Sequence, residues 1–310
     1  MSILIRANLH NLVHPTNISA NYLKNITIQA PSCLADRIIR RTFTPTFNPI
    51  YPTLEKMNPN IDKQLASRIR QLADKYETAE FLAADPSSFM HRVTGAANQE
   101  AMAFIASCLS YGSRKQFFPK IQFVLDASGG EVDSWVRSGE WQNDIADNAE
   151  CFYRLYTRHD MCCLLAAYSH MLNSHGSMKA YVASHATTGI EAVEAICRYF
   201  AEQGASKIVP KNTTSACKRV CMFLRWMVRS ESPVDLGLWA DIISRRTLIM
   251  PLDTHVVQES VRMGLLNSRT ASMSTARRLT DAMLQIFPDD PTRGDFALFG
   301  LGVDEEKEQQ

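Results

Sequence analysis

Residues 210–229 read PKNTTSACKRVCMFLRWMVR, residues 230–249 read SESPVDLGLWADIISRRTLI, and residues 250–266 read MPLDTHVVQESVRMGLL. In the first segment the apolar residues recur at the spacing of one helix face, from Val220 to Val228. The third segment repeats this spacing after Asp253, which stands where a helix N-cap is expected. This stretch therefore predicts a basic amphipathic helix, a loop with a second short amphipathic piece, and a helix that Asp253 opens.

Helical spacing of apolar residues continues through the chain on both sides of this stretch. We expect an amphipathic helix after Asp62, a helix that Asn98 caps, and a helix near 114–127 that Gly129 and Gly130 end. Further helices are expected at 131–138, 144–155, 160–173, 177–183 and near 189–203. Alternating patterns long enough for a useful strand are missing from the sequence. The fold class expected is all-α, a compact globule of many short helices.

The composition points to no particular partner, but it limits the class of protein and its location. The chain has 310 residues and a formal net charge of +1, and 45% of its residues are hydrophobic. It has no apolar run near the length of a membrane span, so we expect no membrane contact. Most of the eight cysteines lie in helical apolar patterns, which favours a reducing, cytoplasmic location.

The two ends of the chain differ in composition from the body. Residues 1–56 lack sustained periodicity, and we expect a disordered leader or a start site that truly lies at Met57; a transit peptide is the alternative. Residues 57–303 are expected to form one helical domain, and residues 304–310 a polar tail.

Positive charge is concentrated in one part of this nearly neutral chain. Eleven lysines and arginines lie between Lys211 and Arg278, against five acidic residues. Lys218, Arg225 and Arg229 follow a second face of the first helix, either as a footprint for a phosphate backbone or as a solvated face. The residues before that helix are all capping types, and a helix start of this kind either is simply capped or also binds a phosphate; they are Asn212, Thr213, Thr214 and Ser215.

The segment from Pro251 to Leu266 (P-L-D-T-H-V-V, then R-M-G-L-L) resembles a signature of the helix-hairpin-helix GPD superfamily of base-excision DNA glycosylases. The closing stretch D-F-A-L-F-G-L-G from Asp295 resembles the late helix of that superfamily, and A-S-C-L-S-Y-G-S from Ala106 resembles its early helix. The chain is also similar to an uncharacterised bacterial family with the same C-K-R, M-F-L-R-W-M-V-R and P-L-D-T-H pieces. The resemblance implies a two-lobed helical fold that binds duplex DNA with a damaged base.

The same resemblance implies roles for individual residues. Asp253 matches the catalytic carboxylate of these glycosylases. Lys218, 35 residues earlier in the sequence, matches the lysine that attacks the sugar, at a spacing similar to that of archaeal 8-oxoguanine glycosylases. Tyr111 matches the residue that wedges into DNA when a base flips, with a packed tyrosine as the alternative. DNA contacts are further expected from these residues: Lys211, Asn212, Thr213, Thr214, Ser215, Arg219 and Arg225.

Two features depart from the superfamily pattern. The glycine-rich hairpin that grips a phosphate is replaced by the glycine-free segment 210–215, and the four-cysteine motif of an iron–sulfur cluster does not follow the last helix. We expect no cofactor, and no metal at the histidines and cysteines near 159–175, because they form no closed four-ligand pattern. A monomeric damaged-purine glycosylase is the leading hypothesis, with 8-oxoguanine as the first substrate. The alternatives are a non-catalytic nucleic-acid-binding protein of the same fold and an all-α interaction protein.

Overall fold

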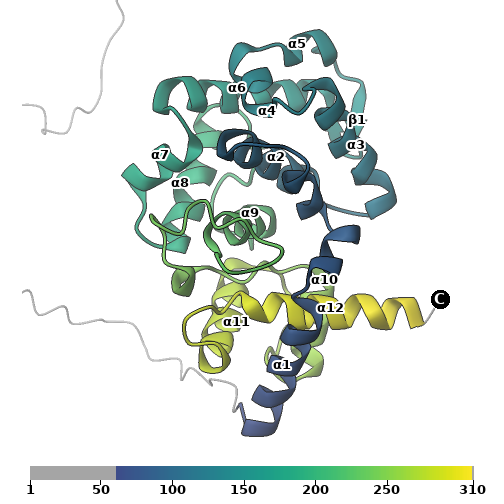
Figure 1. The fold of residues 1–310 in the computed structure, drawn as a ribbon, viewed down its shortest axis with the longest axis vertical. Helices are drawn as coiled ribbons and strands as arrows, with labels where there is room; N and C mark the ends of the chain where they lie inside the picture. The colour runs from purple at the N-terminus through teal and green to yellow at the C-terminus, as the bar shows by residue number, and fades with distance from the viewer. Residues whose placement is uncertain (1–60, 309–310) are drawn as a thin grey trace, which may run out of the picture. The chain divides into compact units, whose positions relative to one another are not determined.

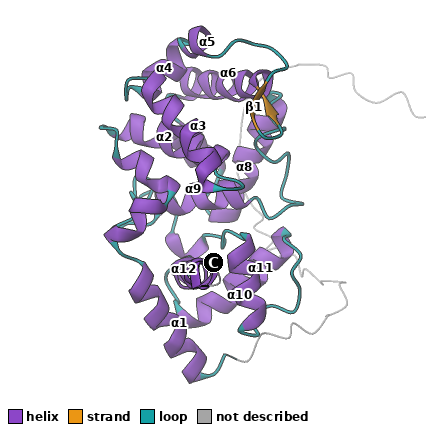
Figure 2. Cartoon of the chain, turned by 90° about the vertical axis from the view of Figure 1, so that its right-hand side faces the viewer, coloured by secondary structure: helices purple, strands orange, loops and turns teal. Residues whose placement is uncertain are grey.

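The computed structural model describes residues 61–308, with side chains as far as Glu305. The expectations for residues 1–56 lie outside the described residues. The helices are α1 (Lys63–Tyr76), η1 (Ala79–Ala84), η2 (Pro86–His91), α2 (Ala96–Leu109), α3 (Arg114–Ala127), α4 (Val132–Ser138), α5 (Trp141–Asp144), α6 (Arg158–His175), α7 (Met178–His185), α8 (Gly189–Glu202), α9 (Lys218–Val228), η3 (Arg245–Thr247), α10 (Thr254–Arg262), α11 (Met273–Ile286) and α12 (Arg293–Glu308). Two short strands, β1 (Cys151–Tyr153) and β2 (Tyr156–Thr157), form an antiparallel hairpin. The predicted all-α class is confirmed (Figure 2).

Within the described residues the helices form two groups. Helices α1, α10, α11 and α12 lie together at one end, and α2 to α8 lie at the other, with α9 between them (Figures 1 and 2). Helix α12 packs on both α1 and α10, whereas α9 packs on α2 and α8. Segments from the two ends of the described chain therefore make up the first group.

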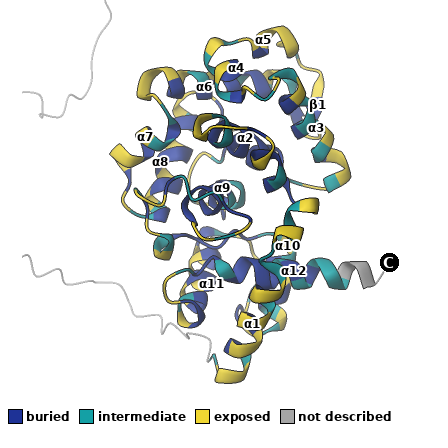
Figure 3. Cartoon of the chain, viewed as in Figure 1, coloured by how far each residue is buried: buried dark blue, intermediate teal, exposed yellow. Residues whose placement is uncertain are grey.

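Helix α9 runs through the centre of the molecule and is largely buried (Figure 3). The Phe223 ring meets Phe104 of α2 edge-on at 5.5 Å and the Trp239 ring at 5.2 Å. Aromatic pairs in this geometry stabilise a core beyond the area they bury. The apolar stripe predicted from Val220 to Val228 is thus the central packing face of the protein.

Glycines in α12 allow its neighbours to approach closely. A Cβ added at Gly302 would lie 2.7 Å from the Cβ of His255, and one added at Gly300 would overlap the Tyr76 ring. Residue 302 therefore sits where only glycine lets α12 meet the first turn of α10 without a shift. Helix α12 also continues to Glu308, through most of the segment expected to be a polar tail.

The predicted helix at 144–155 is wrong. Helix α5 ends at Asp144, and the chain then forms the β1–β2 hairpin. The reason is packing: the aromatic side chains of Phe152, Tyr153 and Tyr156 are buried by the hairpin, and aromatic residues suit a half-buried extended chain. Helical spacing among a few apolar residues could not distinguish the two arrangements.

Asn98 does not cap its own helix as predicted. Helix α2 begins earlier, with Gly95 at the N-cap, and the Asn98 Oδ1 accepts a hydrogen bond from the backbone N–H of Asp133 at 3.0 Å. Asn98 therefore provides a hydrogen-bond acceptor for a backbone N–H in the first turn of α4, 35 residues away in sequence.

The second amphipathic piece, at 230–249, is mostly irregular and contains only the short η3. Its backbone instead ends α9: the N–H groups of Leu236 and Trp239 donate to the carbonyls of Trp226 and Met227 at 2.8 and 2.7 Å. These carbonyls at the C-terminal end of the helix need partners from outside it, which explains why this loop folds back over α9.

None of the helices in the described part of the chain combines the length and apolar character needed to cross a membrane.

Candidate functional site

A pocket of about 760 Å³ lies where α9, α10 and α12 meet η1, η2 and the loop between α2 and α3. Its lining mixes apolar rings, including Phe81, Phe117 and Phe299, with charged side chains. The charged lining residues are Asp85, Arg114, Lys115, Lys218, Arg225, Asp253 and Asp295. A pocket of this size and mixed character is typical of a small-ligand or base-binding site.

The structure brings Lys218 and Asp253 together in this pocket. The Lys218 Nζ lies 3.8 Å from the Asp253 Oδ2, with the lysine side chain 33% exposed and the aspartate side chain 12% exposed. The other carboxylate oxygen of Asp253 accepts a 2.8 Å hydrogen bond from the backbone N–H of Val256 and so caps α10, as predicted. The N-cap bond fixes the carboxylate, while the second oxygen faces the amine.

The turn before Lys218 positions this lysine at the first residue of α9. The N-cap residue is Cys217, which has a left-handed backbone with φ of +47° and makes no side-chain cap. The prediction that 212–215 cap this helix is therefore wrong. Asn212 instead accepts from Thr214 within its own turn, and Ser215 accepts from Cys217.

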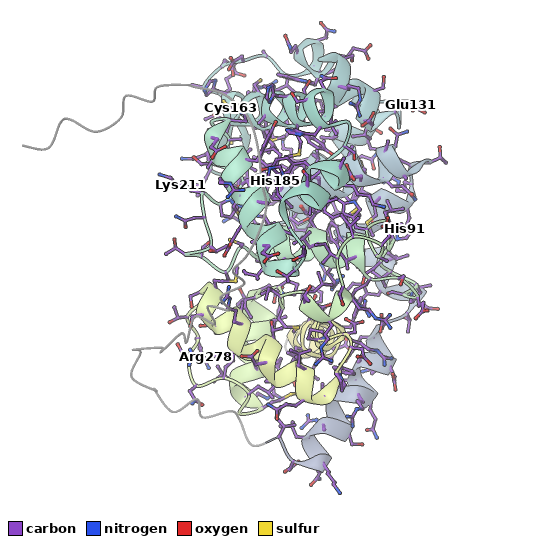
Figure 4. The ribbon with its side chains drawn as sticks, turned by 90° about the vertical axis from the view of Figure 1, so that its left-hand side faces the viewer. His91, Glu131, Cys163, His185, Lys211 and Arg278 are labelled. Carbon is purple, nitrogen blue, oxygen red and sulfur yellow. The ribbon has the colours of Figure 1, made fainter. Side chains whose placement is uncertain are left out.

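The segment 211–215 lies away from the pocket. Its residues are exposed or half-exposed, and none of them lines the pocket. Lys211 is at the surface, on the side of the molecule shown in Figure 4, and Ser215 forms an isolated antiparallel bridge with Ser272. The phosphate contacts expected from Lys211, Asn212, Thr213, Thr214 and Ser215 stay a prediction.

Arg225 and Arg229 are not on an exposed face, contrary to both interpretations of the basic line. Each is only 3% exposed. Arg225 forms ion pairs with Asp295 and Asp235, and Arg229 with Asp235, Asp290 at 2.8 Å and Glu77 at 2.5 Å. These carboxylates neutralise both guanidinium groups. Arg225 therefore lines the pocket as part of a buried ion-pair network and is not a free cation at the surface.

Asp295 is a further carboxylate of the pocket, beside Asp85 and Asp253. Its side chain is buried, and this burial raises the pKa of Asp295 to about 6, against the opposing effect of the Arg225 guanidinium. The charge of Asp253 raises this pKa further, and that of Lys218 lowers it. Both charges act on Asp295 because Lys218 and Asp253 line the same pocket as this carboxyl.

Tyr111 lies on the wall of the pocket, in a cluster with the hairpin. Its ring is 5.0 Å from Tyr153 and 5.1 Å from Tyr156, and the Arg219 guanidinium lies 5.5 Å above it. The Arg219 side chain also donates to the carbonyl of Cys108 at 2.8 Å and so hydrogen-bonds the C-terminal end of α2. Tyr111 is half-buried, which favours the packed alternative over a wedge.

The hairpin tip carries an exposed apolar side chain that the sequence did not single out. Leu155 is 75% exposed, and its backbone N–H donates to the Tyr111 hydroxyl at 3.3 Å. Arg154, beside it, has a left-handed backbone with φ of +51°, and its guanidinium lies 5.3 Å from the Tyr111 ring. Leu155 was missed in the sequence because a helix was predicted over 144–155. The side chain is exposed only because the chain turns between β1 and β2 at this point.

Arg114 and Lys115 add positive charge at the pocket rim, at the start of α3. The Arg114 guanidinium lies 5.5 Å from the Phe299 ring. Much of the basic charge farther along the chain is neutralised: Arg262, for example, pairs with Glu259 and Glu305. Arg114, Lys115 and Lys218 are thus the cations that the pocket presents outside the buried network.

The residues near 159–175 that were considered as metal ligands form other contacts. His159 pairs with Asp147 at 2.7 Å and contacts the Cys163 sulfur at 3.5 Å, and His170 bonds the Tyr199 hydroxyl at 2.7 Å. Over residues 61–305, no group of three or more histidine, cysteine or acidic side chains is placed to hold a metal ion.

Residues 85–304 match the family described as "Protein of unknown function (DUF2400)". The chain belongs to this family. All the residues that line the pocket except Phe81 fall within the part that the DUF2400 family covers. The searches of curated proteins and of solved structures found no match.

Proposed function

We propose that this DUF2400 protein is a DNA-repair glycosylase that removes a damaged purine and cleaves the strand through a Schiff base. The observation that carries the proposal is the pairing of the Lys218 amine with the Asp253 carboxylate, 3.8 Å apart in an open pocket. The resemblance of the D-T-H segment to base-excision glycosylases agrees with it. The spacing of 35 residues between Lys218 and Asp253 also agrees, because it is similar to that of archaeal 8-oxoguanine glycosylases.

The chemistry follows from the two groups. Neutral Lys218 would attack C1′ of the damaged nucleotide, forming the N–C1′ bond as the glycosidic bond breaks and the base departs with the bonding electrons. Asp253 would stabilise the positive charge that develops on the sugar and would accept the proton that the lysine nitrogen must lose. Opening of the sugar ring then leaves a Schiff base, from which the 3′ phosphate can be eliminated.

The pocket suits an extruded base. Its volume of about 760 Å³ exceeds that of a purine, and its aromatic walls offer faces against which a flipped base can stack. The cationic rim at Arg114 and Lys115 can contact the phosphates beside the flipped nucleotide. We take 8-oxoguanine as the first substrate, and duplex DNA as the partner of a monomeric, cytoplasmic enzyme; the described cysteines, all of them free thiols, agree with a reducing compartment.

The test is reductive trapping. Borohydride added to the protein with a duplex containing 8-oxoguanine should give a covalent complex, which Lys218→Gln abolishes and Asp253→Asn reduces by about 10²-fold or more. Lys63→Gln is the matched control, because Lys63 is exposed, lies outside the pocket and is not among the residues expected to contact DNA.

The alternatives give different outcomes. A non-catalytic nucleic-acid-binding protein would bind duplex DNA with a salt-dependent affinity that Asp253→Asn leaves unchanged, and would give no trapped complex. An interaction protein would bind no DNA even at low salt. Trapping that survives Lys218→Gln would contradict the assignment of the nucleophile.

A further inference from the structure

Two buried thiols meet directly beside Lys218, and the proposed reaction uses neither. The Cys197 Sγ of α8 lies 3.9 Å from the Cys217 Sγ, and the two residues are 0% and 3% exposed. Cys217 is the N-cap residue of α9, so it precedes the lysine by one peptide bond. We propose that Cys197 and Cys217 are a peroxide-sensitive pair that closes to a disulfide and thereby displaces Lys218.

The surroundings of the two sulfurs make them chemically unequal. Cys217 accepts a hydrogen bond from Cys197, and the Ser215 hydroxyl lies 3.6 Å from its sulfur. These contacts lower the pKa of Cys217 against the effect of burial, while the same contact and burial raise the pKa of Cys197. The pair therefore offers one sulfur that ionises more readily than the other, and a neighbouring thiol that can resolve its oxidised form.

Oxidation proceeds in two balanced steps with hydrogen peroxide as the oxidant. The Cys217 thiolate attacks one peroxide oxygen, the O–O bond breaks, and hydroxide leaves and takes a proton from solvent, so that Cys217 becomes a sulfenic acid. The Cys197 sulfur then attacks the Cys217 sulfur, and the S–O bond breaks as water leaves with the thiol proton. Two thiols are oxidised, and one peroxide is reduced to two waters.

Closure requires movement at the lysine. A disulfide holds its sulfurs about 2.05 Å apart, so the two sulfurs must approach by about 1.9 Å. The backbone of Cys217 is left-handed, and its thiol donates to the carbonyl of Asn212 at 3.3 Å, so closure breaks this bond and, we infer, shifts the turn. Since Lys218 follows directly, its amine moves relative to Asp253; the catalytic consequence rests on the proposed function, whereas the disulfide does not.

Mass spectrometry tests the bond without reference to DNA. The full chain is treated with hydrogen peroxide, its remaining thiols are alkylated under denaturing conditions, and trypsin releases the peptides 180–198 and 212–218, which carry the two cysteines. The expected result is a linked pair of these peptides, lost on addition of dithiothreitol and absent from Cys197→Ser. Cys163→Ser is the control, since Cys163 is half-exposed and should leave the link unchanged.

Other results would overturn the proposal. Peroxide that oxidises exposed Cys151 while Cys197 and Cys217 remain alkylatable would show that the pair is unreactive, and a sulfinic acid at Cys217 without a link would show that Cys197 does not resolve it.

The effect on Lys218 has two measurements. Trapping with cyanoborohydride, which reduces a Schiff base but leaves a disulfide intact, should fall on the order of 10²-fold in the linked protein and recover with dithiothreitol, because displacing a reacting group by an ångström has effects of this size. If the reduced protein traps no DNA, the proposed function fails, and the coupling is then judged by acetylation of Lys218 relative to Lys63, which is exposed and lies outside this turn. An equal acetylation ratio in the linked and reduced proteins would overturn the coupling.

Discussion

Replacing Asp295 with asparagine should change how the stability of the protein depends on pH. Burial raises the pKa of this carboxyl from 3.8 to about 6. Between these values the folded protein binds more protons than the unfolded chain, so the free energy of unfolding falls as the pH rises through this interval. At about 1.36 kcal/mol for each pKa unit, this one group makes wild type about 3 kcal/mol less stable above the interval than below it.

Asparagine keeps the shape of the side chain but does not titrate. The free energy of unfolding of wild type minus that of Asp295→Asn should therefore fall by about 2–3 kcal/mol between about pH 4 and pH 7. Other carboxyls contribute in both directions: burial raises the pKa of Glu100, whereas Arg229 lowers that of Glu77 against the effect of burial. These contributions largely cancel in the difference between the two proteins.

Urea denaturation followed by circular dichroism at a series of pH values measures this difference. Glu194→Gln is the control, because the Glu194 side chain is exposed and forms no ion pair with another described residue; a similar fall in that variant would show that the effect does not belong to the pocket. A difference for Asp295→Asn that rises with pH would refute the reasoning, because it would mean that the Arg225 ion pair outweighs burial and lowers the pKa of Asp295 in the folded protein.

Three further variants test the packing and the site. Arg229→Met should lower the free energy of unfolding by about 3–5 kcal/mol, because it leaves buried carboxylates unpaired, and a loss below about 1 kcal/mol in urea denaturation would contradict the buried network. Gly302→Ala should lower the free energy of unfolding by about 1–3 kcal/mol, measured by thermal melting, because the added Cβ meets His255; an unchanged or raised melting temperature would show that α12 can yield. Leu155→Ala should change the free energy of unfolding by less than about 0.5 kcal/mol in urea denaturation, because the Leu155 side chain is 75% exposed; a loss above about 1 kcal/mol would show that the hairpin tip depends on this side chain for packing.

Local sequence was sufficient for much of the helical framework. The predicted cap at Asp253 is observed, and the helix predicted after Asp62 begins there with Asp62 as its cap; each aspartate accepts a hydrogen bond from a backbone N–H three residues ahead. Such caps depend on neighbours within one turn, so residue type and spacing identify them. The Lys218–Asp253 pair was suggested only by resemblance, since nothing local relates two residues 35 positions apart; the structure shows that they share one pocket.

Contacts between distant segments decided the rest. Lys218, Arg225 and Arg229 look alike in sequence, but Arg225 pairs with Asp295, 70 residues later, and Arg229 with Glu77, 152 residues earlier. Burying these guanidinium groups without the carboxylates would strongly destabilise the fold, because a buried charge needs a partner. The tertiary fold therefore determines which cations remain available at the pocket. The same holds for the hairpin tip at Leu155 and for the thiol contact beside Lys218. The sequence by itself determined the helices and the types of side chain available for chemistry, because those depend on neighbours along the chain. Which of these side chains meet in one pocket, and which are neutralised in the core, was decided by tertiary packing, because charge pairing and burial depend on neighbours in space.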